Sequence, residues 1–167
     1  DHPAAIITTS PVVHGDRLYV GVSSWEEFRA PGPYTCCSFR GSVVALDRKT
    51  GKVVWKTYTT PGSEAPGYTG VAVWGSTSVV DPQRGSLYVA TGYNYKVPTA
   101  VLDCQGLPTP AQVATCVAEV PGAEQNLFDS VLSLDLATGK VKWVHRGANF
   151  DSFNGACLIP GSKECTT

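Results

Sequence analysis

The chain has 167 residues, of which 43% are hydrophobic, and its 13 basic and 14 acidic residues leave a net charge of -1. This length and composition suffice for a hydrophobic core and are not typical of a disordered chain. A near-neutral charge without charged runs gives no support to nucleic acid or an anionic membrane as a partner, and no apolar run approaches the length of a membrane span.

Glycine, proline and cysteine content narrow the fold class further. Seventeen glycines and twelve prolines interrupt every stretch in which a long helix could form, so we expect an all-β chain. Six cysteines, none in a C-x-x-C metal spacing, favour disulfides and an oxidising compartment. We therefore expect a secreted or extracellular protein, periplasmic in a bacterium. No charged-then-apolar leader precedes Asp1, which predicts a processed mature chain or part of a longer one.

The first predicted sheet occupies residues 8–60. Residues 11–22 indicate two strands around a turn, and a proline-rich excursion follows at 25–34. Residues 41–55, GSVVALDRKTGKVVW, then predict a β-hairpin in which apolar residues alternate up to Asp47. Gly51 would supply the positive φ that the tight turn needs.

The hairpin returns at residues 129–143 as DSVLSLDLATGKVKW, with its turn glycine at Gly139. Two hairpins of one design, separated by other strands, indicate a radially repeated β architecture. We therefore predict antiparallel four-stranded propeller blades. Trp55 and Trp143, which end the two hairpins, would pack between blades.

The second blade is predicted at residues 71–146. Its first strand would run through residues 71–76 and 78–81, and its second through residues 86–92, where Leu-Tyr-Val repeats the same tripeptide at residues 18–20. The spacing between repeats requires an insertion, which we place at residues 93–128. This stretch contains four prolines and reads as an irregular loop closed by a Cys104–Cys116 disulfide.

Residues 147–167 are expected to begin a third blade, with Cys157 paired to Cys165. Two blades and the edge of a third cannot close a ring, because each blade buries its faces against neighbours. Further blades must therefore come from additional chain or from self-association.

The repeated Leu-Asp-x-x-Thr-Gly-Lys-Val-x-Trp resembles the Trp-docking repeat of pyrroloquinoline quinone (PQQ) dehydrogenases, which non-enzymatic propellers also carry. Longer strings at residues 36–47, 73–82, 87–98 and 151–157 resemble the polyvinyl-alcohol-dehydrogenase-like branch. The resemblance covers essentially the whole chain. It implies part of an eight-bladed secreted quinoprotein that oxidises primary or secondary alcohols with PQQ and a calcium-type ion.

The resemblance also implies a cofactor site. Cys36 and Cys37 would form a ring disulfide over one face of the quinone, and Trp74 would stack on the opposite face. Arg40 would bind a carboxylate or quinone oxygen of PQQ. As alternatives, the two cysteines are staples to distant partners, and Trp74 fills the core.

Two positions depart from the family pattern. Tyr93 stands where the family has a metal-ligating Asn, and Asn94, our candidate metal ligand, is shifted by one residue, which in a strand turns the side chain to the other face. Asn154 stands in place of the catalytic Asp, so Asp151 becomes our candidate base, although the base could equally lie on blades outside this chain. No C-x-x-C-H haem motif is present, so electrons would pass to a separate acceptor.

Two hypotheses for function follow. The first is a secreted quinoprotein alcohol dehydrogenase that oxidises small or polymeric alcohols with PQQ. The second is a non-catalytic secreted β-propeller, either a binding module or a self-assembling structural subunit. The departures at Tyr93 and Asn154 favour the second hypothesis, whereas the four expected cofactor contacts favour the first.

Overall fold

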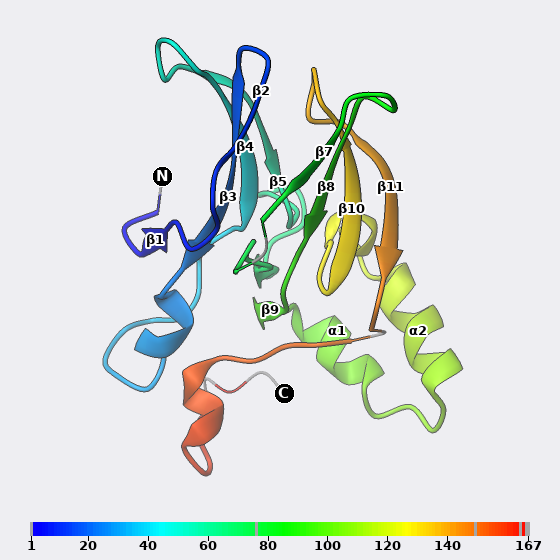
Figure 1. Cartoon of the computed structure of the whole chain (residues 1–167). Helices are drawn as coiled ribbons and strands as arrows, with labels where there is room; N and C mark the ends of the chain where they lie inside the picture. Colours follow the sequence, from blue (N-terminus) through cyan, green and yellow to red (C-terminus); the bar gives the residue numbers. More distant parts are fainter. Residues whose placement is uncertain (1, 76, 149, 164, 166–167) are drawn as a thin grey trace.

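The computed structural model describes residues 2–75, 77–148, 150–163 and 165 of the chain. Two antiparallel sheets stand side by side, and two helices lie beside one end of the second sheet (Figure 1). Strands β2, β3, β4 and β5 follow one another in the first sheet, and β1 pairs with the end of β3. Their bounds are Ala5–Ile6 (β1), Val12–His14 (β2), Arg17–Ser24 (β3), Ser42–Asp47 (β4) and Val53–Tyr58 (β5).

The second sheet has the order β11-β10-β8-β7. The bounds of these strands are Val79–Asp81 (β7), Ser86–Ala90 (β8), Ser130–Asp135 (β10) and Val141–Arg146 (β11). A small separate pair is formed by β6 (Thr69–Gly70) and β9 (Asn94–Lys96). Each large sheet thus contains four strands in which every strand is antiparallel to its neighbours. This arrangement confirms the predicted blade architecture.

The two hairpins have the same geometry. The carboxylate of Asp47 accepts hydrogen bonds from the amide and hydroxyl of Thr50 at 2.8 and 2.7 Å. The carboxylate of Asp135 accepts the equivalent bonds from Thr138 at 2.9 and 2.8 Å. Both hairpins also shift register directly after the residue that faces the tryptophan. The predicted sequence repeat is therefore a structural repeat.

The sheets contact each other through Trp55, which lies over the turn of the second hairpin. Its indole Nε1 donates a hydrogen bond to the carbonyl of Leu136 at 3.1 Å, and the Tyr19 hydroxyl donates to the same carbonyl at 3.2 Å. The Thr57 hydroxyl donates to the carbonyl of Gly139 at 2.7 Å. The turn of one blade is thus a docking surface for the outer strand of the preceding blade.

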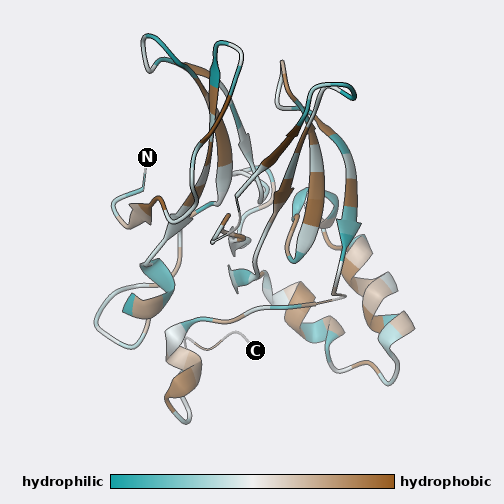
Figure 2. Ribbon diagram, viewed as in Figure 1, coloured by the Kyte–Doolittle hydropathy of each residue, from teal (hydrophilic) through white to brown (hydrophobic). Residues whose placement is uncertain are grey.

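The main core lies between the two sheets, and hydrophobic residues follow their strands (Figure 2). The buried members of this core are Tyr19, Val43, Ala45, Trp55, Val73, Leu87, Val89, Leu127, Leu132 and Leu134. Because the core draws on both sheets, neither blade buries its inner face alone.

The two outward faces of the pair lack such a neighbour within the described chain. Trp143, the counterpart of Trp55, is 47% exposed, and Val141 and Val144 beside it on β11 are also exposed. On the first blade, a Cβ added to the turn glycine Gly51 would meet nothing within 4 Å. The pair of blades thus exposes apolar residues of β11 on one side and the uncovered turn at Gly51 on the other.

The two turn glycines provide a matched test of this docking. Gly139 and Gly51 have φ values of +71° and +70°, but a Cβ at Gly139 would lie 2.5 Å from the Trp55 ring. Both alanine variants should lose about 1–2 kcal/mol from left-handed strain. We expect Gly139→Ala to lose about 1–3 kcal/mol more, because the methyl group displaces the indole. Urea denaturation measures the difference, and equal losses would contradict the docking contact.

The first strand of the second blade is shorter than predicted. Residues 71–75 form no strand, while Ser76 lies outside the described residues. Val71 has a φ of +50° and Gly75 one of +70°, which interrupts extended backbone. Hydrogen bonds nevertheless hold this segment beside the chain that links β8 to β9: Val71 N donates to Tyr93 O at 2.8 Å, and Gly92 N to Ala72 O at 2.9 Å.

The insertion at residues 93–128 is not the irregular loop that was expected. It contains β9, α1 (Thr99–Cys104), α2 (Pro110–Glu119) and the short 3-10 helix η2 (Ala123–Gln125). The predicted Cys104–Cys116 disulfide is present and joins the two α-helices. The helices form because they bury a small core of their own, composed of Tyr68, Val97, Val101, Cys104, Val117 and Val120. The chain is mainly β, but it is not free of helix.

The C-terminal segment crosses back toward the first blade (Figure 1). Ser152 forms an isolated bridge with Asn94, and a 3-10 helix, η3 (Gly155–Leu158), follows. The Cys157–Cys165 disulfide is present as predicted. That this segment begins a third blade stays a prediction.

Candidate functional site

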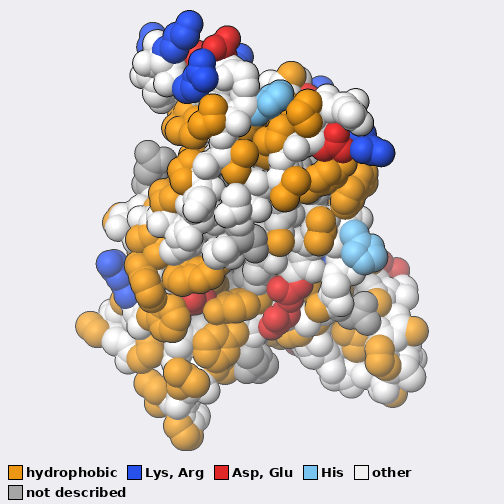
Figure 3. Space-filling model, viewed as in Figure 1, with side chains coloured by type: hydrophobic (Ala, Val, Ile, Leu, Met, Phe, Trp, Pro, Cys, Tyr) orange, Lys and Arg blue, Asp and Glu red, His pale blue; other side chains and the backbone are white. Residues whose placement is uncertain are grey.

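A cavity of about 360 Å³ lies beside Trp74. Its lining residues are Glu27, Phe28, Ala72, Trp74, Gly92, Tyr93 and Tyr95. They come from the excursion after β3, from the segment before β7 and from the segment around β9. On the face shown in Figure 3, lysine and arginine side chains gather mainly around the hairpin tips. Four aromatic rings and one carboxylate thus define the chemistry of this cavity.

Trp74 presents a flat surface to this cavity. Its side chain is 42% exposed, and its ring meets Trp25 edge-on, with centroids 5.3 Å apart and an interplanar angle of 88°. Trp25 in turn contacts Phe28 at 5.3 Å. This aromatic group fixes the indole while leaving part of it open, so the core-filling alternative for Trp74 is not favoured.

Glu27 and Tyr93 form a polar pair in the same cavity. Glu27 is only 4% exposed, and the Tyr93 hydroxyl donates to its Oε2 at 2.7 Å. Burial raises the pKa of Glu27, and the Tyr93 hydrogen bond partly offsets that rise. Burial and the nearby Glu27 raise the pKa of Tyr93, so its phenol remains a donor at neutral pH. Sequence reasoning missed Glu27; the signal was two adjacent glutamates within the aromatic run Trp25 to Phe28.

Cys36 and Cys37 are bonded to each other, which confirms the implied pairing and makes the staple alternative wrong. Cys36 is buried, and Cys37 packs against a cluster that includes Ala72 and Tyr95, two residues that line the Trp74 cavity. The two cysteines do not line the cavity themselves, and the disulfide is linked to it through these shared neighbours.

Arg40 does not join this group. Its guanidinium donates to the carbonyl of Thr60 at 2.7 Å and lies 4.0 Å from the ring centroid of Tyr58. It lines two other depressions and not the cavity beside Trp74. The structure thus places Trp74 in the cavity lining, the disulfide against a cluster that contributes to that lining, and Arg40 elsewhere.

Asn94 is completely buried, and its amide is used within the protein. Its Nδ2 donates to Asn126 Oδ1, and Asn126 Nδ2 donates to Asn94 Oδ1, both at 2.9 Å. Across the described residues, no group of three histidine, cysteine or acidic side chains could hold a metal ion. A role for Asn94 as metal ligand stays a prediction, and this amide pair does not favour it.

Asp151 lies beside a second carboxyl group that sequence reasoning missed. Asn94 N donates to the carbonyl of Asp151 at 3.2 Å, and Asp129 N donates to Gly92 O at 3.1 Å, so both acids flank Tyr93. Burial, together with a hydrogen bond to Asp151 and its charge, raises the pKa of Asp129 to about 6. The catalytic role of Asp151 stays a prediction. Asn154 is buried and caps η3, donating to the carbonyl of Tyr95 at 3.0 Å.

The carboxyl pair predicts a pH dependence of stability. Because the folded-state pKa of Asp129 is raised to about 6 from 3.8, its contribution is full below about pH 4 and lost as pH rises through 6. Asp129→Asn should therefore leave stability unchanged near pH 4 and raise it by about 1 kcal/mol at pH 7, after discounting for partial exposure. Asparagine also tolerates the φ of +40° found here. Urea denaturation at both pH values tests this, and a stability loss at pH 7 would contradict it.

Comparison with known proteins identifies relatives of this chain. The chain is 33% identical over 177 aligned residues to a polyvinylalcohol dehydrogenase from a Pseudomonas species, covering 99% of this chain and 23% of that protein. It is 31% identical to a polyvinylalcohol dehydrogenase from Sphingopyxis sp. strain 113P3, with 98% and 23% covered. No family model matches the chain.

A solved structure agrees in fold. Quinohemoprotein alcohol dehydrogenase ADHIIG from Pseudomonas putida HK5 superposes with a TM-score of 0.61 at 21% identity, covering 92% of this chain and 22% of that one. The chain belongs to the PQQ-type quinoprotein family. The predicted resemblance to its polyvinyl-alcohol-dehydrogenase-like branch is thereby confirmed. The chain spans 23% of the length of the two relatives, so the similarity concerns that part of their sequences.

Proposed function

We propose that the chain contributes two blades to an eight-bladed, secreted, PQQ-dependent alcohol dehydrogenase of the polyvinyl-alcohol-dehydrogenase-like kind. The observation that carries this proposal is that an open indole, Trp74, lines a cavity, and that the Cys36–Cys37 disulfide packs through Cys37 against the cluster that supplies Ala72 and Tyr95 to the same lining. Family membership supports alcohols as the substrate class. Three disulfides support an oxidising compartment, and no helix among the described residues has the length and apolarity to cross a bilayer.

The residues around this cavity suit the flat ring system of PQQ better than they suit the negative charges of its carboxylates. Trp74 offers a stacking face, and the cavity of about 360 Å³ is large enough for a small planar group. Glu27 is the charged residue of the lining, and Arg40 is held at Thr60. The carboxylates of PQQ would therefore be matched by cations on other blades, and a calcium-type ion would take its ligands there.

PQQ, when bound, supplies the two-electron acceptor for alcohol oxidation, and a separate acceptor would then receive the electrons. In this chain Trp74 would orient the ring, and the disulfide would exclude water from its neighbourhood. Asp151 is the candidate proton acceptor, and Asp129 would share a proton with it through their hydrogen bond. Tyr93 would hold Glu27 oriented at the cavity wall.

The test requires a protein of the relatives' full length that carries this segment. After incubation with PQQ and calcium, it should bind quinone and reduce a dye when primary or secondary alcohols are added. Cys36→Ser should abolish most of this signal, while Cys104→Ser, which opens a remote disulfide, should retain quinone binding. Failure of the complete protein to take up quinone would overturn the proposal.

The second hypothesis, a non-catalytic propeller that binds other molecules or assembles with itself, has its own support. Glu27 in the cavity and the engaged guanidinium of Arg40 are unfavourable for an anionic cofactor, and the amide of Asn94, which is bonded to Asn126, is unfavourable for a metal ligand. A complete protein without quinone uptake would leave this hypothesis in place.

A further inference from the structure

The loop that carries the Cys36–Cys37 disulfide is attached to a buried carboxylate. Glu26 belongs to the 3-10 helix η1 (Glu26–Arg29), which directly follows β3, and its side chain is 0% exposed. The amide of Glu26 donates to Ser24 Oγ at 2.8 Å, so the residue is itself fixed to the end of β3. A buried carboxylate is costly unless several donors satisfy it.

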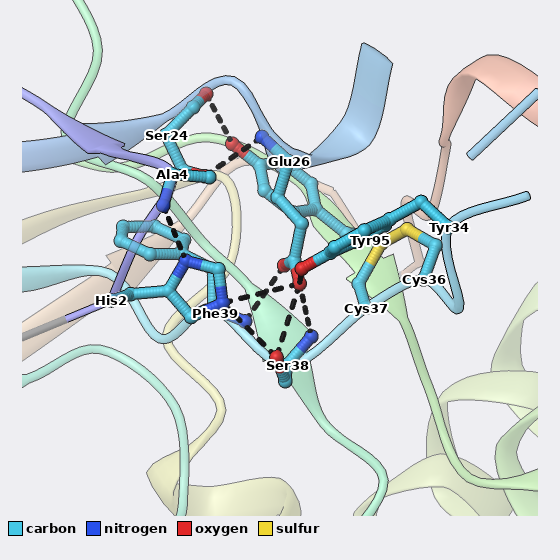
Figure 4. Close-up of polar contacts among 10 residues, drawn as sticks. All are labelled: His2, Ala4, Ser24, Glu26, Tyr34, Cys36, Cys37, Ser38, Phe39 and Tyr95. Atoms are coloured by element: carbon cyan, nitrogen blue, oxygen red, sulfur yellow. Dashed lines mark hydrogen bonds and ion pairs between the residues drawn. A yellow bond between two sulfur atoms is a disulfide. The ribbon is translucent and has the colours of Figure 1, made fainter. Parts of the chain in front are cut away.

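Glu26 receives donors from both sides of the disulfide (Figure 4). Its Oε1 accepts from the Tyr34 hydroxyl and the Ser38 amide, both at 2.8 Å, and from Ser38 Oγ at 3.1 Å. Its Oε2 accepts from the Phe39 amide at 2.7 Å. Tyr34 lies two positions before Cys36, and Ser38 directly follows Cys37. One side chain therefore holds both arms of the loop.

His2 also contacts the Glu26 carboxylate and Ser38. Its Nε2 lies 3.3 Å from Glu26 Oε1 and 3.0 Å from Ser38 Oγ. Its Nδ1 accepts from the Ala4 amide at 3.1 Å, so Nε2 is the nitrogen that carries a proton toward this group. The hydrogen bond to Glu26 also raises the pKa of Tyr34, consistent with a phenol that donates to a carboxylate.

We propose that Glu26 is a positioning residue that fixes the Cys36–Cys37 disulfide against the cluster that contributes Ala72 and Tyr95 to the lining of the Trp74 cavity. A carboxylate accepts hydrogen bonds on both oxygens, whereas a glutamine has one acceptor oxygen and would turn an NH₂ group toward N–H or O–H donors. The positioning rests on the contacts alone; its relevance to quinone binding rests on the proposed function.

The chain offers a matched control for this proposal. Glu27 is the neighbouring residue and nearly as buried, but its carboxylate accepts a hydrogen bond from Tyr93 and, within the described part of the chain, none from Tyr34, Ser38 or Phe39. Glu26→Gln and Glu27→Gln each remove one buried negative charge from the same short helix. A difference between the two variants therefore reports the contacts and not the charge or the burial.

The experiment measures the rate at which each disulfide is reduced under limiting dithiothreitol, by alkylation and peptide mass spectrometry, with no quinone present. In Glu26→Gln we expect Cys36–Cys37 to be reduced at least tenfold faster than in the unmodified protein. Cys104–Cys116, which lies in the helical insertion, should keep its rate and serves as the internal reference. Glu27→Gln should resemble the unmodified protein at both disulfides.

Unchanged reduction of Cys36–Cys37 in Glu26→Gln would overturn the proposal, and so would an equal acceleration of Cys104–Cys116, since that indicates general unfolding. If Glu26→Gln does not fold, Tyr34→Phe removes one donor and should accelerate the same disulfide about threefold; no acceleration there also overturns it. PQQ affinity is measured separately on the complete protein. A selective acceleration without any quinone binding would support the role of Glu26 and sink the proposed function alone.

Discussion

Trp55→Ala should cost this chain about 3–5 kcal/mol of unfolding free energy, whereas Trp143→Ala should cost less than about 1 kcal/mol. The two residues occupy equivalent positions in the repeated hairpin. Trp55 is buried against the turn of the next blade and bonded to Leu136, while Trp143 is 47% exposed. The expected difference follows because, among the described residues, a second sheet packs on Trp55 but not on Trp143.

Urea denaturation of the 167-residue chain followed by circular dichroism measures both losses. Trp55→Phe provides a control, because it keeps an aromatic ring on the turn and removes the indole hydrogen bond; we expect an intermediate loss. Similar losses for Trp55→Ala and Trp143→Ala would show that docking between the sheets does not stabilise this pair.

Trp74→Ala should lower the PQQ affinity of the complete protein about ten- to a hundredfold, because stacking on an aromatic ring is worth about 1–3 kcal/mol. Trp74 is partly open and is held edge-on by Trp25, so its removal deletes a stacking surface without opening the core. Trp74→Phe should retain most of the affinity.

Equilibrium dialysis with PQQ and calcium gives these affinities, and thermal melting shows whether the variants remain folded. Trp25→Phe is the matched control, since it alters the same aromatic group without removing the stacking face. Unchanged affinity in Trp74→Ala would place the quinone elsewhere, even if the protein is an active dehydrogenase.

Local chemistry made the blades predictable from the sequence. The turn between Asp47 and Gly51 is stabilised by hydrogen bonds over three residues and by a left-handed glycine. Such short-range contacts leave a direct pattern in the sequence, and the second copy confirms it. The Cys104–Cys116 and Cys157–Cys165 pairs were predictable for the same reason, because their partners are close along the chain.

The helical insertion was missed because its signals are short. Thr109 caps α2, and Pro110 stands at its first turn, a combination typical of a helix start. The helices bury their apolar residues against Tyr68, which is distant in sequence. The interruption of extended backbone at Val71 was missed for a similar reason. Nothing in this run of apolar residues signals the left-handed φ of Val71.

The candidate site was predicted only in part. Trp74 and the Cys36–Cys37 pair were found because they occur in distinctive strings; Trp74 lines the cavity, and Cys37 packs against a cluster that contributes Ala72 and Tyr95 to its lining. The Arg40 side chain is turned away from the cavity by its hydrogen bond to the Thr60 carbonyl, and no local sequence pattern predicts this bond. Asn94 faces Asn126, 32 residues away, and Glu26 and Glu27 gain their roles from the loop and strand segments that fold over them.

The central claim is that these two sheets are adjacent blades of a larger ring. The most direct test is a crystal structure of a protein of the relatives' full length that carries this segment. We expect the Trp143 indole to lie on the turn of a following sheet, donating to a carbonyl as Trp55 does to Leu136. A structure in which Trp143 faces solvent and no sheet packs against β11 would contradict the account.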